Sequence, residues 1–373
     1  MPFQNPLLPD CFLTWTEPPD ESGDEIFRVV SWRRSLTLKG HSFREFAREV
    51  APLLDGRHSM DAICDEVADL FERPDLEAAL DMLGAQGIVV ESETPERELP
   101  ARLAPQLGWL GEAAPEGRAA QRKLTGARVV LFGAGGPGAT AARALAAAGI
   151  GRLLIVDPAP VGAADPYVSA LYGDADIGQP RAAVLAERLA AVGPETEIAA
   201  ETARPADPKA IGALIAGADM VLCCLESGEL NLALKLNRAA RAAGIRWLSG
   251  AMEGTELLIG PGFSGAPDAA CYMCWRMREV AAAGNPQARF ALEKRLDRLQ
   301  SDLGARRENL AVGADIVGGM LAAEAISVLS GAAEPSLDGR FLTLDLPGLR
   351  QEKHTVLRKP GCPVCGGGTA PAA

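Results

Sequence analysis

The sequence predicts an α/β protein with a mostly parallel sheet, a structural metal and a smaller α+β domain in front of it. From residue 125 to residue 260, short apolar runs alternate with helical patterns, which is typical of a parallel sheet covered by helices. A glycine-rich loop, Gly133–Gly138, follows the first of these runs and opens a helix. Two Cys-x-x-Cys pairs, Cys271–Cys274 and Cys362–Cys365, offer the four thiolates that tetrahedral zinc prefers.

Length and composition restrict the function classes. The 373 residues are enough for two or three domains. A net charge of −12 argues against a duplex nucleic-acid binder, because phosphate contacts need clusters of Lys and Arg. No cationic stretch leads into an apolar N-terminal run, and no apolar run reaches the ~20 residues of a membrane span. Eight cysteines, four of them in Cys-x-x-Cys pairs, indicate a reducing compartment with bound metal. We expect a cytoplasmic protein with no nucleic-acid or membrane partner.

Residues 1–93 predict a small winged-helix-like domain of three strands followed by three helices. The strands are expected at Phe12–Glu17, Glu25–Trp32 and Ser35–Lys39. The first helix is expected to begin at a capping box formed by Ser42 and Glu45. The third helix follows Pro74 and ends at Gly84.

A linker and a tail are expected outside the domains. Residues 94–124 contain four prolines and are rich in Ala, Glu and Arg, which favours a linker. Residues 367–373 are of low complexity, and we expect them to be disordered.

The second domain is expected to span residues 125–366. Its strands are expected at Arg128–Phe132, Arg152–Val156, Glu197–Glu201, Asp219–Cys224, Arg246–Ser249, Arg340–Asp345 and Glu352–Leu357. A nearly all-apolar helix, Ala311–Leu329, is expected to be either core or a dimer interface.

The glycine-rich loop has two readings. Gly133, Gly135, Gly136 and Gly138 lie between a strand and a helix, and the next strand ends at Asp157, at the spacing usual for a ribose contact. Glycines there let backbone N–H groups approach a phosphate at the helix N-terminus. The alternative is a tight turn that needs glycine and binds nothing.

Three segments carry a specific resemblance: Gly133–Gly138, Gly149–Asp157 and Ala175–Arg181. Together they resemble the ThiF/MoeB family, the ubiquitin-activating type of adenylating protein, over roughly residues 125–366. The resemblance implies a Rossmann-like adenylation fold with a zinc knuckle, binding of ATP and Mg²⁺, adenylation of a C-terminal carboxylate, and a homodimer.

Departures from the family pattern predict a vestigial nucleotide site. Asp157 is kept, but the second acid of the family is Ala159, its Asn is Asp165, its Arg is Val168 and its Lys is Arg181. Ala and Val cannot ligate Mg²⁺ or neutralise phosphoryl charge, and an added Asp repels phosphate. We therefore expect no catalytic residues and neither ATP nor Mg²⁺ as a cofactor. The alternative is an active ATP-dependent adenylating enzyme in which Glu226 and Arg181 still serve.

The first domain carries a second resemblance. The segment Leu54–Ile63, with the order of strands and helices, resembles the recognition element of ribosomally synthesised peptide (RiPP) pathways. The whole chain is similar to the ThiF-like partner of a YcaO cyclodehydratase from thiazole/oxazole-modified peptide pathways. That resemblance implies a protein that binds the leader of a precursor peptide and presents its core to YcaO, the subunit that uses ATP.

Strand addition would give this domain a physical binding mode. A leader could pair with the edge Ser35–Lys39, which carries Leu36 and Leu38, and fill a groove against the third helix. The expected groove wall is Leu76, Ala79, Leu80 and Leu83. Arg33 and Arg34 could pair with acidic leader residues. The alternative is that the leucines are core and the arginines belong to a solvated turn.

The zinc prediction rests on residue type and spacing. Cys271, Cys274, Cys362 and Cys365 fill all four positions of a tetrahedral site, which leaves no open position for hydrolytic chemistry. We expect structural zinc that ties the end of the chain to its middle.

Overall fold

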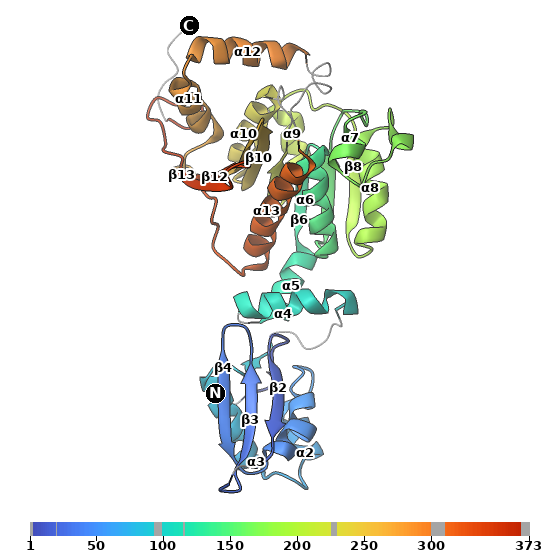
Figure 1. Ribbon diagram of the computed structural model, residues 1–373, viewed down its shortest axis with the longest axis vertical. Coiled ribbons are helices and arrows are strands. Elements are labelled where there is room, and N and C mark those ends of the chain that lie inside the picture. The colour runs from blue at the N-terminus through green and yellow to red at the C-terminus, as the bar shows by residue number, and fades with distance from the viewer. Residues whose placement is uncertain are drawn as a thin grey trace. The chain divides into compact units, whose positions relative to one another are not determined.

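The computed structural model describes residues 3–19, 21–92, 99–114, 116–224, 230–299 and 310–366. The chain forms two compact units (Figure 1). The first is Met1–Lys123 with Ser330–Ala333, and the second is Leu124–Leu329 with Glu334–Ala373. Each unit has its own hydrophobic core.

The first unit contains a three-stranded antiparallel sheet in the order β2-β3-β4. Its strands are β2 (Leu13–Glu17), β3 (Glu25–Val30) and β4 (Ser35–Gly40). Phe27 and Val29 point from the central strand into the core, where Phe27 packs edge to face on Phe46. The three strands agree with those predicted from the alternation of apolar residues, and among the described residues β4 is an edge strand.

Helices cover the inner face of this sheet. They are α1 (Phe43–Glu45), a π-helical turn (Phe46–Val50), a 3-10 turn (Ala51–Leu53), α2 (Met60–Glu66) and α3 (Arg73–Ala85). A two-stranded ribbon joins β1 (Pro6–Leu7) to β5 (Val90–Glu91). The capping box predicted at Ser42 is wrong: Ser42 has a left-handed backbone and its side chain caps nothing. Ser59 is the residue whose side chain caps a helix, by accepting from Ala62 N.

The stretch predicted as a linker contains helices. Residues 99–114 and 116–124 include a 3-10 turn (Ala101–Leu103), α4 (Ala104–Ala113) and the start of α5 (Gly117–Gly126). Pro105 lies in the first turn of α4, where its missing N–H would have no partner in any case. Arg118 of α5 forms a two-pronged ion pair with Asp10, at 3.0 and 3.1 Å. Residues 93–98 lie outside the described part of the chain.

The second unit is built on an eight-stranded sheet in the order β13-β12-β11-β10-β9-β6-β7-β8. Its strands are β6 (Arg128–Phe132), β7 (Arg152–Val156), β8 (Glu197–Glu201), β9 (Met220–Cys223), β10 (Trp247–Glu253), β11 (Glu256–Phe263), β12 (Arg340–Asp345) and β13 (Arg350–Thr355). The half from β10 to β8 is parallel and the half from β10 to β13 is antiparallel. The sheet is therefore mixed rather than mostly parallel, because β11, which the sequence pattern missed, turns the chain back.

Helices lie on both faces of this sheet (Figure 1). They are α6 (Gly136–Ala147), α7 (Asp165–Val168), α8 (Arg181–Val192), α9 (Pro208–Ile215), α10 (Leu230–Ala243), α11 (Tyr272–Ala282), α12 (Pro286–Leu299) and α13 (Ala311–Ser330). Ile211 and Leu236 pack on one face, and Leu321 approaches Gly250 on the other.

Helix α13 is the one helix among the described residues that is long and apolar enough to cross a membrane. Core helices of ordinary proteins pass the same test. Gly318 approaches the backbone of α6 so closely that an added Cβ would lie 2.3 Å from Pro137 O. This close packing supports a core role for one face of α13.

Candidate functional site

The glycine-rich loop makes the sharp turn from β6 into α6. Gly133 has φ +90°, a left-handed conformation that favours glycine. A Cβ on Gly138 would lie 1.9 Å from Gly133 O, and one on Gly136 would lie 2.8 Å from Ala314 Cβ. Gly135 is the N-cap residue of α6 and provides no side-chain hydrogen bond to the helix. Gly133, Gly136 and Gly138 are thus required by the turn and its packing, whether or not a ligand binds.

Asp157 ends β7 and turns its carboxylate onto this loop. Its Oδ2 accepts from Ala134 N at 2.7 Å, and its Oδ1 accepts from Ala159 N at 2.8 Å. The residue is only 4% exposed. Both oxygens therefore already hold backbone donors of the chain itself.

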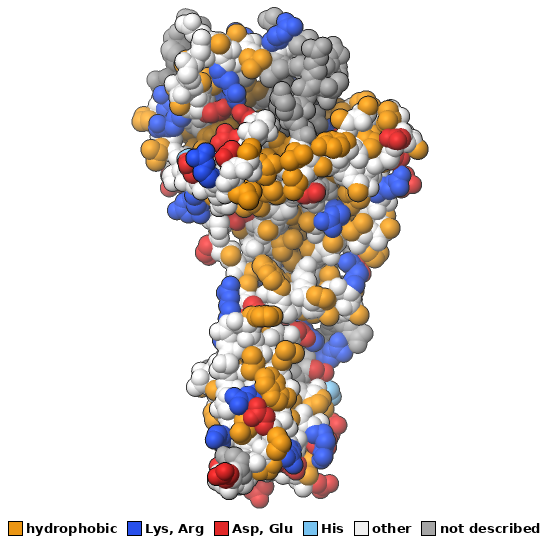
Figure 2. Space-filling view, viewed as in Figure 1, with side chains coloured by type: hydrophobic (Ala, Val, Ile, Leu, Met, Phe, Trp, Pro, Cys, Tyr) orange, Lys and Arg blue, Asp and Glu red, His pale blue; other side chains and the backbone are white. Residues whose placement is uncertain are grey.

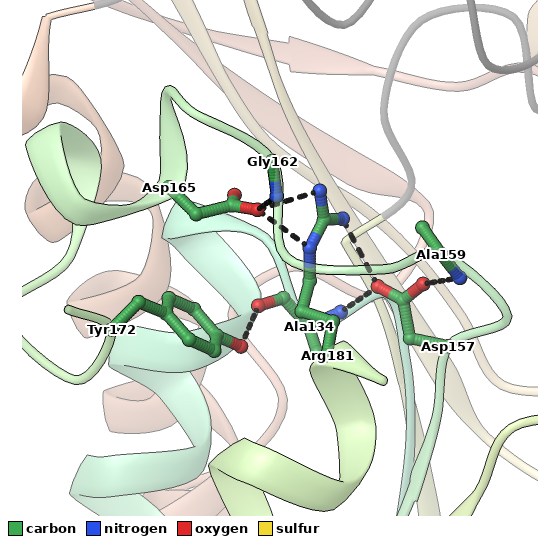
Figure 3. Close-up of polar contacts among 7 residues, drawn as sticks. All are labelled: Ala134, Asp157, Ala159, Gly162, Asp165, Tyr172 and Arg181. Atoms are coloured by element: carbon green, nitrogen blue, oxygen red, sulfur yellow. Dashed lines mark hydrogen bonds and ion pairs between the residues drawn. The ribbon is translucent and has the colours of Figure 1, made fainter. Parts of the chain in front are cut away.

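Arg181, at the start of α8, lies between two carboxylates (Figure 3). Its Nη1 is 3.3 Å from Asp157 Oδ2, and its Nε and Nη2 are each 3.0 Å from Asp165 Oδ2. Asp165 also accepts from Gly162 N at 2.7 Å. All three charged side chains are buried. The structure thus joins three residues that the sequence analysis had marked separately, Asp157, Asp165 and Arg181, in one ion cluster, here called the acid–arginine cluster.

The surroundings of the acid–arginine cluster are poor in positive charge. Arg181 is the only Lys or Arg from residue 157 to residue 181, whereas that stretch has four Asp. Val168, at the family's Arg position, is buried, and its Cγ2 lies 3.4 Å from where a Cβ on Gly136 would be. The hydroxyl of Tyr172 donates to Ala134 O at 2.6 Å, and this bond helps to fix the glycine-rich loop. The acid–arginine cluster itself has two carboxylates and one guanidinium, and this excess of negative charge disfavours a phosphate beside it.

The four knuckle cysteines come together as predicted. Their Sγ atoms all lie within 4.8 Å of one another, and all four residues are buried. Cys271 Sγ is 3.9 Å from Cys274 Sγ and 3.7 Å from Cys362 Sγ. Zn–S bonds of 2.3 Å in a tetrahedron give S···S distances of about 3.8 Å. The two distances from Cys271 match this value, and Cys274 Sγ lies 3.2 Å from Cys365 Sγ, so the four thiols are close to the spacing that zinc needs.

The polypeptide favours the thiolate form at Cys274, whereas burial raises the pKa of Cys271 and of Cys365. Burial works to raise the pKa of Cys274, but hydrogen bonds from the backbone of Cys271 and Lys359 outweigh it and lower this pKa to about 7. Lys359 N donates to Cys274 Sγ at 3.3 Å. Arg278 of α11 donates to Leu357 O and Arg358 O, which joins the two knuckles without metal. Zinc would be held by the four cysteines as a structural ion.

The expected groove wall of the first unit divides into buried and accessible residues. Leu76, Leu80 and Leu83 are at most 3% exposed and belong to the core, which is the alternative considered for them. Ala79 is half-buried. On the strand side, Leu36 and Leu38 are partly buried against the same core. A bound peptide would therefore meet the rim of this core, not these three leucines.

The two arginines of the β3–β4 turn differ. Arg33 is exposed, and the structure gives its backbone N–H a bond to Ser31 Oγ. Arg34 donates to Gly87 O at 2.8 Å and lies over the Phe12 ring, 4.8 Å from its centre. Arg34 thus joins the turn to the end of α3.

The register of β4 defines what its open edge presents. Ser31 N donates to Arg34 O at 2.7 Å, so Arg34 forms a hydrogen-bonded pair across the hairpin. Pairing alternates along an antiparallel ladder, so the backbone N–H and C=O groups of Ser35, Thr37 and Lys39 point away from β3. This edge can accept an additional strand.

Comparisons with known proteins agree with this architecture. The ThiF family matches residues 105–364. Molybdopterin-synthase adenylyltransferase of Salmonella typhimurium is 29% identical over 249 residues, which are 66% of this chain and 90% of that protein. The SAMP-activating enzyme E1 of Haloferax volcanii is 30% identical over 259 residues, 69% of this chain and 86% of that protein.

Solved structures resemble the chain over nearly its full length. E. coli MccB with MccA-N7isoASN has a TM-score of 0.65 at 16% identity, covering 97% of this chain and 99% of that one. MccB in complex with N-formylated MccA gives the same TM-score. PaaA has a TM-score of 0.62 at 18% identity, covering 78% of this chain and 95% of that one. At these identities the likeness concerns the fold.

Proposed function

This chain belongs to the ThiF family, and we propose that it binds the leader of a ribosomal precursor peptide and presents it to a YcaO cyclodehydratase. In this proposal the chain does not adenylate its ligand. The YcaO partner supplies the ATP-dependent step of azoline formation, and this chain supplies recognition.

The acid–arginine cluster carries the proposal. An adenylating site must hold a triphosphate, and electrostatic stabilisation of the phosphates is the main catalytic contribution to such transfers. Arg181 is the one Lys or Arg from residue 157 to residue 181, and its charge is already neutralised by Asp157 and Asp165. Freeing Arg181 would leave two buried carboxylates uncompensated, which is strongly unfavourable.

The open edge of β4 supports the recognition role. The edge is six residues long. If a leader paired with it as an additional strand, every second leader side chain would lie beside the partly buried Leu36 and Leu38. Main-chain hydrogen bonds would supply affinity, and the rim of the core with the exposed Arg33 would supply selectivity. MccB, which shares this fold, has been solved in complex with N-formylated MccA.

Fluorescence polarisation tests this role. A labelled leader peptide from a short open reading frame beside the gene is titrated with the zinc-loaded chain, with the core half of the same precursor as control. We expect submicromolar binding of the leader alone. Equal affinity for both halves, or for neither, would overturn the proposal.

The second candidate function is an active adenylating enzyme. Two observations favour it: the glycine-rich loop and Asp157 are retained, and the chain is about 30% identical to adenylating relatives over two thirds of its length. Calorimetric titration with ATP and Mg²⁺ separates the candidates, because an enzyme must bind the nucleotide.

Assembly and compartment complete the proposal. Figure 2 shows hydrophobic side chains gathered over α13. Val312 of this helix is 49% exposed and Ile316 is partly exposed, so this face would be covered by a second copy in a homodimer. The four clustered thiols of the zinc site need a reducing compartment to stay unoxidised, which suits the cytoplasm.

A further inference from the structure

The large sheet of the second unit ends in an open edge at β13. Val356 N donates to Gly339 O at 2.7 Å, so these two residues form a hydrogen-bonded pair. The register then shows which residues of β13 form hydrogen-bonded pairs with β12 and which do not. The alternation of an antiparallel ladder then turns the backbone groups of Gln351, Lys353 and Thr355 away from β12. These three residues are exposed, and no strand among the described residues pairs with this side.

A pocket of about 500 Å³ lies beside this edge. One wall is formed by Phe341, His354 and Val356 of the β12–β13 hairpin and its exit, and the other by Trp275 and Ala282 of α11. The Phe341 ring stacks on His354 at 4.8 Å and meets the Trp275 ring edge to face at 6.1 Å. Arg278, Glu279 and Arg289 also line the pocket. Its aromatic side, Phe341 and Trp275, matches an aromatic or large apolar side chain.

The charge around this edge is opposite to that of the whole protein. From Arg340 to Lys359 there are five Lys or Arg residues and two acidic ones, a net charge of +3, whereas the chain carries −12. Lys353 points to the face of the hairpin opposite His354. An extended segment on this edge would therefore be favoured if it carried acidic side chains on one face and an aromatic one on the other.

Charged edge strands also occur in proteins simply to prevent unwanted pairing. That role requires no pocket. Here a pocket lies on the face of β13 that carries His354, beside α11. Every second side chain of an added strand would point to that same face, so the edge and the pocket can act as one site with main-chain and side-chain parts.

We propose that β13 and this pocket bind an acidic, extended segment of a partner protein that inserts one aromatic or large apolar side chain. The site lies in the second unit and is independent of leader binding at β4. Its recognition is by strand addition, with the pocket selecting the anchor residue.

Peptide display tests this site. A library of 12-residue peptides is selected on the zinc-loaded full chain, and the most enriched peptide is synthesised and titrated by fluorescence polarisation. We expect an aromatic residue flanked by acidic ones. Lys353→Pro removes an outward N–H and should weaken binding at least about tenfold, whereas Lys353→Ala, which removes only the charge, should weaken it about threefold.

A second pair of variants addresses the pocket. Ala282 lines the pocket and is exposed, so Ala282→Trp should fill the pocket and abolish peptide binding. Ala281 is also exposed but does not line the pocket, so Ala281→Trp should leave peptide binding unchanged. Zinc content confirms that each variant is folded. Enrichment no greater than on an unrelated bait, or an enriched peptide indifferent to both Lys353→Pro and Ala282→Trp, would overturn the proposal.

Discussion

Arg181 donates from Nη1 to Asp157 Oδ2 across 3.3 Å, although 24 residues separate the two in the chain. Asp165 is the third member of this acid–arginine cluster, because its Oδ2 accepts from Arg181 Nε at 3.0 Å. The residues that the sequence resemblance assigns to nucleotide binding thus bond to one another in an internal ion cluster.

Removing the central cation should destabilise the second unit. Arg181→Met leaves Asp157 and Asp165 buried without their partner, and we expect a loss of about 3–5 kcal/mol in the free energy of unfolding. Urea denaturation followed by circular dichroism measures it. Arg350→Ala, which breaks an exposed pair with Asp345, should change stability by less than about 1 kcal/mol. Equal effects of the two variants would refute a buried cluster.

The glycine-rich turn makes a prediction that does not depend on any ligand. Gly138→Ala places a Cβ against Gly133 O, so we expect a loss of roughly 3 kcal/mol, the upper end for forced packing. Gly212→Ala in α9 meets nothing within 4 Å and should stabilise by about 0.5–1 kcal/mol. Thermal denaturation compares the two variants; a neutral Gly138→Ala would contradict the turn geometry.

Zinc content should depend on the second knuckle. Cys362→Ser removes one of four buried ligands, and we expect metal analysis to fall from about one zinc per chain to a small fraction of that. Cys64→Ser, a buried thiol of the first unit, is the matched control and should keep its zinc. An unchanged stoichiometry in Cys362→Ser would show that the four thiols do not share a metal.

Leader binding should depend on the main chain of β4. Thr37→Pro removes an N–H that points to the open edge, and we expect affinity for the leader to fall at least about tenfold, since strand addition relies on such bonds. Thr37→Val keeps the N–H and should bind normally. Lys353→Pro, at the other open edge, should leave leader affinity unchanged. If Thr37→Pro still bound, the leader would lie elsewhere.

Leu80, on the expected groove wall, is unsuitable for a substitution that tests leader binding. Leu80 is fully buried in the core of the first unit, so a carboxylate there would unfold the unit before it could report on a groove. Ala79, half-buried on the same helix, is the residue at which a bulky substitution can probe the groove.

Much of the fold could be predicted because periodicity reflects burial. The runs Arg128–Phe132 and Arg152–Val156 became strands with those bounds, since buried parallel strands are continuously apolar. The strand Glu256–Phe263 was missed because Gly260, Pro261 and Gly262 interrupt it. The helices α4 and α5 were missed because prolines were read as breaks, although Pro105 lies in a first turn.

The candidate site was predictable only in its parts. The clustering of the four cysteines could be predicted from their spacing alone, because two Cys-x-x-Cys pairs are typical of a zinc site. The sequence marked Asp165 and Arg181 as departures from a pattern, but a pattern does not show that two departures compensate each other in space. Tyr172 had no signal of its own, and its bond to Ala134 O depends on the path of the loop. Glu226 lies outside the described residues.

ATP–pyrophosphate exchange by the purified, zinc-loaded chain, with and without leader peptide, tests the central claim most directly. Arg181 is the only Lys or Arg from residue 157 to residue 181, and the acid–arginine cluster neutralises its charge. We therefore predict no exchange above a no-protein background under either condition. Exchange that requires this chain and is lost in Asp157→Asn would contradict the account and establish an adenylating enzyme.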